Sequence, residues 1–131
     1  MTGYIVFGHG SSVESANEAV RNVARQAADR GRWTAFETAF LGGGEPNLAG
    51  AVEALISRGT RRVVVIPYFL TFGTHLERDL PALVEKIQLM HPDLKIQVTA
   101  PLDGHPGMVN AVVDRGQEAV GDPSDSSGES H

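Results

Sequence analysis

The run Val63–Ile66 constrains the fold of this chain more than any other stretch. Four β-branched residues in succession predict a strand buried on both faces, as inner strands of parallel sheets are. Pro67 follows directly and is expected to end the strand, because proline has no N–H to donate to a sheet ladder. A loop with Gly73 and then a helix are expected next, which is the order of a strand–helix–strand unit.

The same alternation runs along the whole chain. Strands are predicted at residues 3–8, 33–41 and 94–100, the last at a sheet edge. Helices are predicted from residues 12–14 to Gly31, from Pro46 to Gly59, from Asp79 to His91, and after Pro106. This order predicts an α/β fold over residues 1–120, a four-stranded parallel sheet with helices on both faces that resembles half of a flavodoxin-like unit.

Local signals set the expected helix starts and the expected buried faces. Ser11 and Glu14 have the spacing of a capping box. Asp79 is expected to cap the third helix, because Pro81 is tolerated only in a first turn. The last helix is expected to bury four apolar residues, Met108, Val109, Val112 and Val113.

Composition excludes several classes of protein. The chain has 131 residues, is 41% hydrophobic and carries a formal charge of −5, which argues against a general nucleic-acid binder. It has no cysteine, which excludes disulfides and thiolate metal sites and fits a reducing, cytoplasmic environment. We find no apolar run long enough for a membrane span and no signal peptide. Residues 121–131 lack large apolar side chains and are expected to form a disordered acidic tail.

Two histidines stand directly after predicted strands. His9 lies between Gly8 and Gly10, and His75 follows the loop after the Val63–Ile66 strand. Ligands of parallel α/β sheets bind outside the carboxyl ends of the strands, and imidazole is a common ligand of transition metals. Helix starts nearby favour anions. These patterns predict a site for a metal and an anionic substrate, although a lone loop histidine is more often a surface or capping residue.

Other polar residues have structural as well as functional interpretations. Glu77 and Asp79 either orient the His75 ring or cap a helix, and capping is favoured for Asp79. His105 is either a helix cap or a site residue, whereas His91 has the position of a helix C-terminus. Gly42–Gly44 resembles a phosphate loop but lacks the P-loop lysine. Phosphoryl transfer through His9 ranks last, because histidine phosphatases have arginine where this chain has Gly8.

Four motifs in order resemble the small class II tetrapyrrole chelatases, the short sirohydrochlorin chelatases. They are Gly8-His9-Gly10-Ser11 with Ala16-Asn17, Ala39-Phe40-Leu41 with Glu45-Pro46-Asn47-Leu48, the stretch from Pro67 to Pro81 that contains Gly73, His75 and Asp79, and Ala100-Pro101-Leu102 with His105-Pro106. The resemblance covers about residues 3–118.

The resemblance implies insertion of a divalent metal (Co²⁺, Fe²⁺ or Ni²⁺) into an acidic tetrapyrrole, without ATP or an organic cofactor. By carry-over, His9 and His75 hold the metal and accept the pyrrole protons, a role that suits imidazole near neutral pH. Carboxylates of the substrate need cationic or N–H partners, for which Gly10, Ser11, Gly73, Thr74 and Arg78 are candidates. Short members are homodimers, and longer relatives carry two such units in one chain.

The chain departs from the family pattern at two positions. Gly42 stands where members often have an acidic third ligand, and Ser12 where an arginine often follows the first motif. Glu45 is the candidate that compensates for the missing carboxylate as a metal ligand. The departure at Gly42 keeps a second interpretation open, a non-catalytic relative that binds a metal or a tetrapyrrole.

Overall fold

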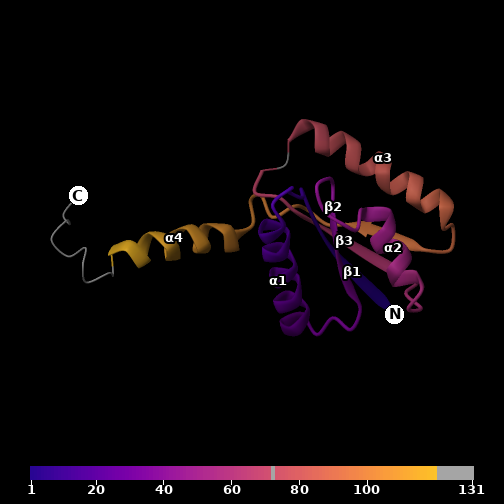
Figure 1. Ribbon diagram of the computed structural model, residues 1–131, viewed down its shortest axis with the longest axis horizontal. Helices are drawn as coiled ribbons and strands as arrows, with labels where there is room; N and C mark the ends of the chain where they lie inside the picture. The colour runs from indigo at the N-terminus through magenta and orange to yellow at the C-terminus, as the bar shows by residue number, and fades with distance from the viewer. Residues whose placement is uncertain (72, 121–131) are drawn as a thin grey trace.

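The computed structural model describes residues 1–71 and 73–120, without the side chain of His75. Strands and helices alternate along these residues (Figure 1). Their order is β1 (Thr2–Gly8), α1 (Glu14–Gly31), β2 (Phe36–Phe40), α2 (Leu48–Ile56), β3 (Arg62–Tyr68), α3 (Thr74–Met90), β4 (Lys95–Val98) and α4 (Pro106–Val120). The predicted tail at residues 121–131 lies outside the described part.

All four strands are parallel and form one sheet in the order β2-β1-β3-β4. The register between β1 and β3 pairs Tyr4 with Val64 and Gly8 with Tyr68. The predicted four-stranded parallel sheet is confirmed, and β4 is the edge strand that its alternating sequence indicated.

The two faces of the sheet are covered by different helices. Odd-numbered residues of β1 face α2, since a Cβ on Gly3 would lie 2.9 Å from the Leu55 side chain. Even-numbered residues face α1, since a Cβ on Gly8 would lie 3.7 Å from Val20. Right-handed crossovers explain this division, because the chain moves in one direction from β1 to β2 and in the other from β2 to β3 and β4.

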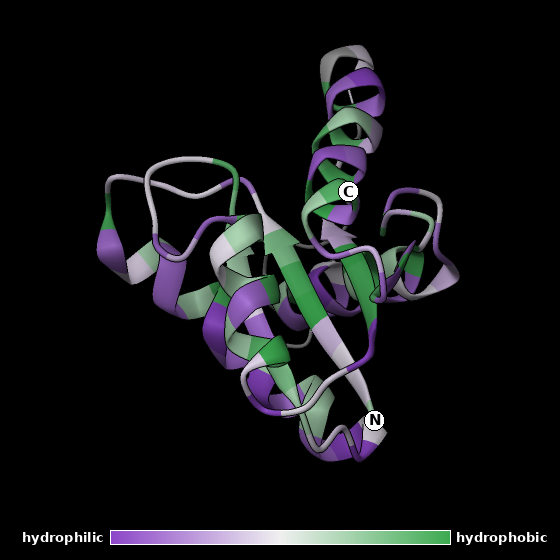
Figure 2. Cartoon of the chain, turned by 90° about the vertical axis from the view of Figure 1, so that its right-hand side faces the viewer, coloured by the Kyte–Doolittle hydropathy of each residue, from purple (hydrophilic) through white to green (hydrophobic). Residues whose placement is uncertain are grey.

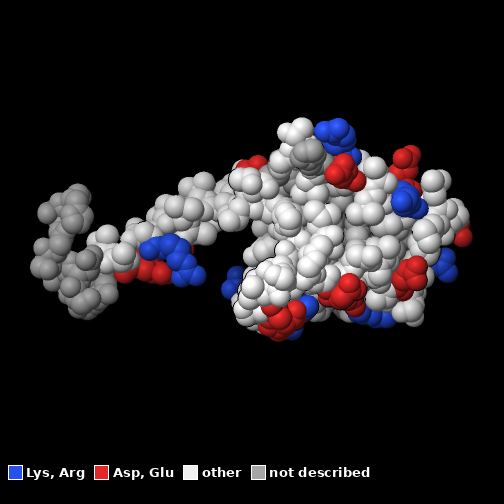
Figure 3. Space-filling model, turned by 45° about the horizontal axis from the view of Figure 1, so that its top comes forward, with Lys and Arg blue, Asp and Glu red and all other residues white. Residues whose placement is uncertain are grey.

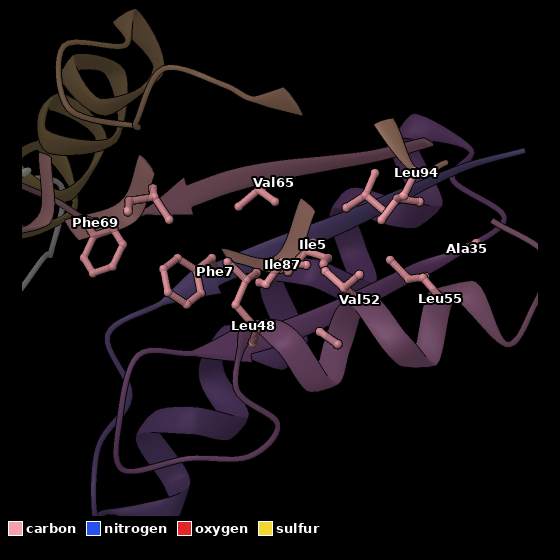
Figure 4. Packing of buried hydrophobic residues seen from close by; sticks show 14 residues of the cluster. Ile5, Phe7, Ala35, Leu48, Val52, Leu55, Val65, Phe69, Ile87 and Leu94 are labelled. Atoms are coloured by element: carbon pink, nitrogen blue, oxygen red, sulfur yellow. The ribbon is translucent and has the colours of Figure 1, made fainter. Parts of the chain in front are cut away.

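The main core lies between the sheet and the helices α2 and α3. Ile5, Phe7, Val63 and Val65 from the inner strands are fully buried there against Leu48, Val52 and Leu55 of α2 (Figure 4). Ile87 and Leu80 of α3 join the same cluster. The strands are coloured largely as hydrophobic in Figure 2, as expected for strands covered on both faces.

Three local expectations about the strand and helix ends are wrong. β3 continues through Pro67 to Tyr68, and Pro67 takes part in the pairing with β1 opposite Phe7. α1 starts at Glu14, as predicted, but the Ser11 hydroxyl accepts a hydrogen bond from the Val13 N–H instead of closing the expected capping box. α2 begins after Asn47, whose side chain accepts from the Gly50 N–H, so the helix start lies just beyond Pro46.

The start of α3 differs from the expectation as well, and it lies earlier in the chain. The helix begins at Thr74 after Gly73, and Pro81 lies inside it. A proline within a helix removes one backbone donor, and the helix tolerates this loss here because Leu80 beside it is buried in the core. Asp79 is therefore not a cap, and His75 lies in the first turn of a helix instead of in a loop.

The last helix is formed but is not buried. α4 runs from Pro106 to Val120 and projects away from the sheet (Figure 1). Val109, Val112 and Val113, which were expected in the core, are exposed. The apolar pattern of α4 predicted the helix correctly, but it did not specify which surface covers that pattern.

Candidate active site

The loops after β1, β2 and β3 meet at the carboxyl edge of the sheet. Together with the start of α3 they enclose a pocket of about 300 Å³. Among the residues that the structure describes, its lining contains one imidazole and one carboxylate with mostly apolar or small residues: His9, Leu41, Phe69, Thr71, Gly73, Leu76 and Asp79. The pocket lies where the sequence predicted a site, because the carboxyl ends of neighbouring parallel strands face the same side.

His9 is an exposed imidazole of this pocket and lies against a buried aromatic ring. The ring centres of His9 and Phe69 are 5.9 Å apart with an interplanar angle of 66°. Phe69 in turn contacts Phe7 edge to face, at 6.0 Å (Figure 4). These contacts anchor one side of the imidazole to the core and leave the ring accessible from the pocket.

The backbone around His9 is fixed by the loop after β2. The Leu41 N–H donates to the Gly8 carbonyl at 2.9 Å and the Gly42 N–H donates to the His9 carbonyl at 3.0 Å. Gly10 has φ of 90°, and a Cβ there would lie only 1.6 Å from the Gly42 carbonyl oxygen. Glycine is therefore required at position 10 by the neighbouring loop, in addition to the left-handed backbone.

Asn17 of α1 connects the same two loops through its side chain. Its side chain is only 2% exposed, and its Oδ1 accepts from the Ser11 N–H at 2.9 Å. Its Nδ2 donates to the carbonyls of Ser11, at 2.9 Å, and Gly43, at 3.2 Å. A buried amide that is satisfied in this way holds the His9 loop against the Gly42–Gly44 loop.

The sequence interpretation did not assign Asn17 a role. The signal was a polar residue on the inward stripe of α1, at helical spacing with the buried residues Ala24 and Ala28. A buried asparagine on such a stripe indicates a hydrogen-bonded positioning role.

The first turns of α3 supply the other side of the pocket. Gly73 and Asp79 line it, and His75 lies one helical turn before Asp79. Residues four apart lie on the same face of a helix, so the backbone places His75 and Asp79 on one face. The side chain of His75 lies outside the part of the chain that the structure describes.

The remaining predicted site residues are distributed around this edge. Glu45 is exposed in the loop before α2, in a cis bond with Pro46, and is not among the residues that line the pocket. Thr74 and Arg78 are exposed on the first turns of α3. His105 caps α4, since its Nδ1 accepts from the Gly107 N–H at 2.8 Å, and His91 ends α3.

Ion pairs along α1 form the charged surface beside the site. Hydrogen bonds from Arg21 hold the pKa of Glu14 below its ordinary value, and those from Arg25 and Arg21 do the same for Glu18. Arg21 also lies 5.4 Å from the ring centre of Phe40, the last residue of β2. Figure 3 shows acidic and basic side chains mixed over the visible surface of the body.

Among the described side chains no group of three or more His, Asp or Glu residues is arranged to hold a metal ion. Among the described side chains that line the pocket, His9 and Asp79 are the groups that can bind a metal. No helix within residues 1–71 and 73–120 is long and apolar enough to cross a membrane.

Comparison with known proteins identifies the family. The family model CbiX matches residues 3–119, nearly all of the described chain. The chain belongs to the CbiX family. These are the small class II chelatases that the four sequence motifs indicated.

Relatives of the CbiX chain differ in length. The sirohydrochlorin cobaltochelatase of Methanopyrus kandleri is 25% identical, over 93% of this chain and 99% of that protein. The sirohydrochlorin cobaltochelatase of Priestia megaterium is 27% identical, over 91% of this chain but only 39% of that protein. The structure of the sirohydrochlorin chelatase SirB from Bacillus subtilis in complex with cobalt has a TM-score of 0.82 at 23% identity, over 89% of this chain and 50% of that one, which shows the shared fold.

Proposed function

We propose that this CbiX chain inserts a divalent metal into an acidic tetrapyrrole of the sirohydrochlorin type, without ATP. Cobalt is the first candidate, with iron and nickel as alternatives, because curated relatives are named cobaltochelatases. The observation that carries the proposal is the pocket at the carboxyl edge, which combines an accessible imidazole, His9, with a carboxylate, Asp79, and the first turn of α3. The metal is a substrate here, and we assign no organic cofactor.

The surroundings of the pocket suit a flat, amphipathic substrate. Leu41 follows β2 directly and Leu70 lies two residues after β3, and they are 46% and 72% exposed. Such apolar side chains at the site favour contact with the face of a macrocycle. The carboxylates around the ring would meet the N–H groups of Gly10, Gly73 and Thr74, the Ser11 hydroxyl and the Arg78 guanidinium.

The site residues would have two roles, binding the metal and accepting protons. His9 and His75 would hold the metal and accept the protons that leave the pyrrole nitrogens, since neutral imidazole can do either near pH 7. The ring contact with Phe69 positions the His9 imidazole, and the hydrogen bond between Asn17 and Ser11 holds the loop that carries it. Fixed geometry of this kind lowers the entropic cost of bringing metal and macrocycle together.

Two carboxylates compete for the position of the third ligand. Glu45 compensates for Gly42 in the sequence interpretation, whereas Asp79 lines the pocket with His9 and lies one turn after His75. We favour Asp79 for this reason. Both Asp79→Asn and Glu45→Gln remove a charge with little change in shape, so they form a matched pair.

The pair of variants tests this assignment through Co²⁺ binding and the initial rate of insertion. We expect Asp79→Asn to weaken Co²⁺ binding and to lower the rate roughly tenfold or more, because it removes an anionic ligand, and Glu45→Gln to leave both within about twofold. The opposite ranking would assign the ligand to Glu45.

A binding protein without catalysis is the second candidate, and Gly42 in place of a carboxylate is the observation that favours it. An anaerobic absorbance time course of sirohydrochlorin and Co²⁺, with and without the protein, separates the two. Protein-dependent acceleration supports the chelatase. A shifted tetrapyrrole spectrum without acceleration, for Co²⁺, Fe²⁺ and Ni²⁺ alike, would show a binding relative.

We also propose that the working form is a homodimer in the cytoplasm. The chain matches about half or less of some relatives, and the resemblance implies that longer members contain two units. Two copies of this chain would then correspond to the two units of one longer chain.

A further inference from the structure

The glycines at the carboxyl edge of the sheet fall into two groups. The first group is required by the loops themselves. A Cβ on Gly10 would lie 1.6 Å from the Gly42 carbonyl oxygen, and a Cβ on Gly44 would lie 2.9 Å from Nδ2 of Asn17. Gly43 has φ of 73°, which other residues rarely adopt. Contacts between the two loops therefore explain why these positions are glycine.

Gly42 and Gly73 form the second group, in which neither packing nor backbone conformation requires glycine. A Cβ on either residue would meet no described atom within 4 Å apart from its chain neighbours. Neither residue has a left-handed φ, and the φ of Gly73 is −71°. Replacing such a glycine by alanine ordinarily stabilises a protein, so the fold does not account for the missing side chains.

The two glycines lie on opposite sides of His9. β1, which leads to His9, pairs with β2 on one side and with β3 on the other. Gly42 comes shortly after β2, and its N–H donates to the His9 carbonyl at 3.0 Å. Gly73 ends the loop after β3 and lines the pocket with His9. Neighbouring strands are about 4.8 Å apart, so the ends of β2 and β3 are separated by roughly 10 Å, a distance comparable with the width of a tetrapyrrole ring.

An exposed leucine accompanies each of these glycines. Leu41 directly precedes Gly42, and Leu70 lies in the same loop as Gly73. The leucine side chains can contact the face of a flat ring, whereas a position without a side chain lets the edge of that ring approach the backbone. At Gly73 this backbone is the start of α3, whose N–H groups suit acidic substituents at the ring edge.

From this arrangement we infer that Gly42 and Gly73 are specificity-determining positions, which leave room for a tetrapyrrole ring to lie across His9 from one loop to the other. This inference rests on the proposed function and specifies where its macrocycle lies. It also gives Gly42 a role of its own. The position provides space for the substrate, instead of only lacking the carboxylate of the family pattern.

Two substitutions fill this space without disturbing the loops. Gly42→Ala adds one methyl group where it would meet no described atom, and Gly73→Ser adds a small side chain that is a better helix N-cap than glycine. We expect both variants to be at least as stable as the parent in thermal unfolding. If Gly73 served only as a cap, Gly73→Ser would bind the substrate as well as the parent does. Gly116→Ala adds the same methyl group on α4 and is the control.

Titration of the metal-free protein with sirohydrochlorin, followed by absorbance, is the direct measurement. We expect the Kd to rise roughly tenfold or more in Gly42→Ala and in Gly73→Ser, because small changes in the volume of a fitted pocket alter binding by about this factor. Gly116→Ala should stay within about twofold of the parent. A separate titration with Co²⁺ alone should give similar binding in the parent and in all three variants.

The outcomes separate this inference from the proposed function. If the parent binds and metallates sirohydrochlorin while both glycine variants bind it as tightly, the proposed function stands and the inference is overturned. A parallel loss of Co²⁺ binding in the two variants would also overturn it, because the glycines would then act through the metal site. A parent that neither binds nor metallates sirohydrochlorin would overturn the proposed function, and this inference with it.

Discussion

At the scale of single residues, the candidate site contains groups that hold His9 in place as well as His9 itself. The sequence predicted the position of His9, because a strand, two glycines and a helix start all lie within a few residues. It did not predict that Gly10 faces the Gly42 carbonyl or that Asn17 joins the two loops. Both features depend on contacts between segments distant in sequence, which local patterns do not encode.

Replacing Asn17 should separate the loops. Asn17→Ala leaves the Ser11 N–H and the carbonyls of Ser11 and Gly43 without their partner, so we expect a loss of about 2 kcal/mol in the free energy of unfolding. Asn22→Ala, on the exposed side of the same helix, should change it by less than about 0.5 kcal/mol. Urea unfolding measures both. Equal losses in the two variants would show that Asn17 contributes only helix propensity.

At the scale of elements, the strands were predicted better than the helix ends. Runs such as Val63–Ile66 identify a strand from composition alone, and the sheet order follows from right-handed connections. Helix ends depend on weaker competing signals. Pro81 indicated a late start for α3, but burial of Leu80 beside it outweighs the missing backbone donor. The environment of α4 was not predictable, because an amphipathic pattern does not specify whether its partner lies in the same chain.

The free energy of unfolding at acidic pH should depend on the ion pairs of α1. The pKa values of Glu14 and Glu18 are lowered in the folded state from 4.5, by hydrogen bonds from Arg21 and Arg25. A carboxylate whose pKa is lower in the folded state stabilises the fold at pH values above its unfolded-state pKa. This contribution disappears as the pH falls through the folded-state pKa. The carboxylates are exposed, so the effect is small.

The double variant Glu14→Gln/Glu18→Gln measures that contribution. We expect the parent to be the more stable protein at pH 7, with the difference disappearing as the pH falls below 4.5. Urea unfolding at neutral and acidic pH gives the comparison. A difference that stays constant across this range would assign it to helix propensity instead of to the ion pairs.

At the scale of the whole molecule, three strand ends, the start of α3 and the glycine loop converge on one edge, while α4 projects from the body. The fold class and the edge that carries the site followed from the sequence, since parallel topology fixes both. The pairing of His9 with Asp79 did not follow, because it depends on where α3 begins. The arrangement agrees with the proposed metal insertion at the strand ends.

The most direct test compares initial rates of Co²⁺ insertion into sirohydrochlorin for the parent, His9→Ala, His75→Ala and His105→Ala. His105 caps α4 and does not line the pocket, so it controls for the loss of an imidazole elsewhere. We predict that the His9 and His75 variants lose at least roughly a hundredfold in rate while His105→Ala keeps most of it. Unchanged insertion in folded His9→Ala would contradict the account, since the pocket would then not be the site of the reaction.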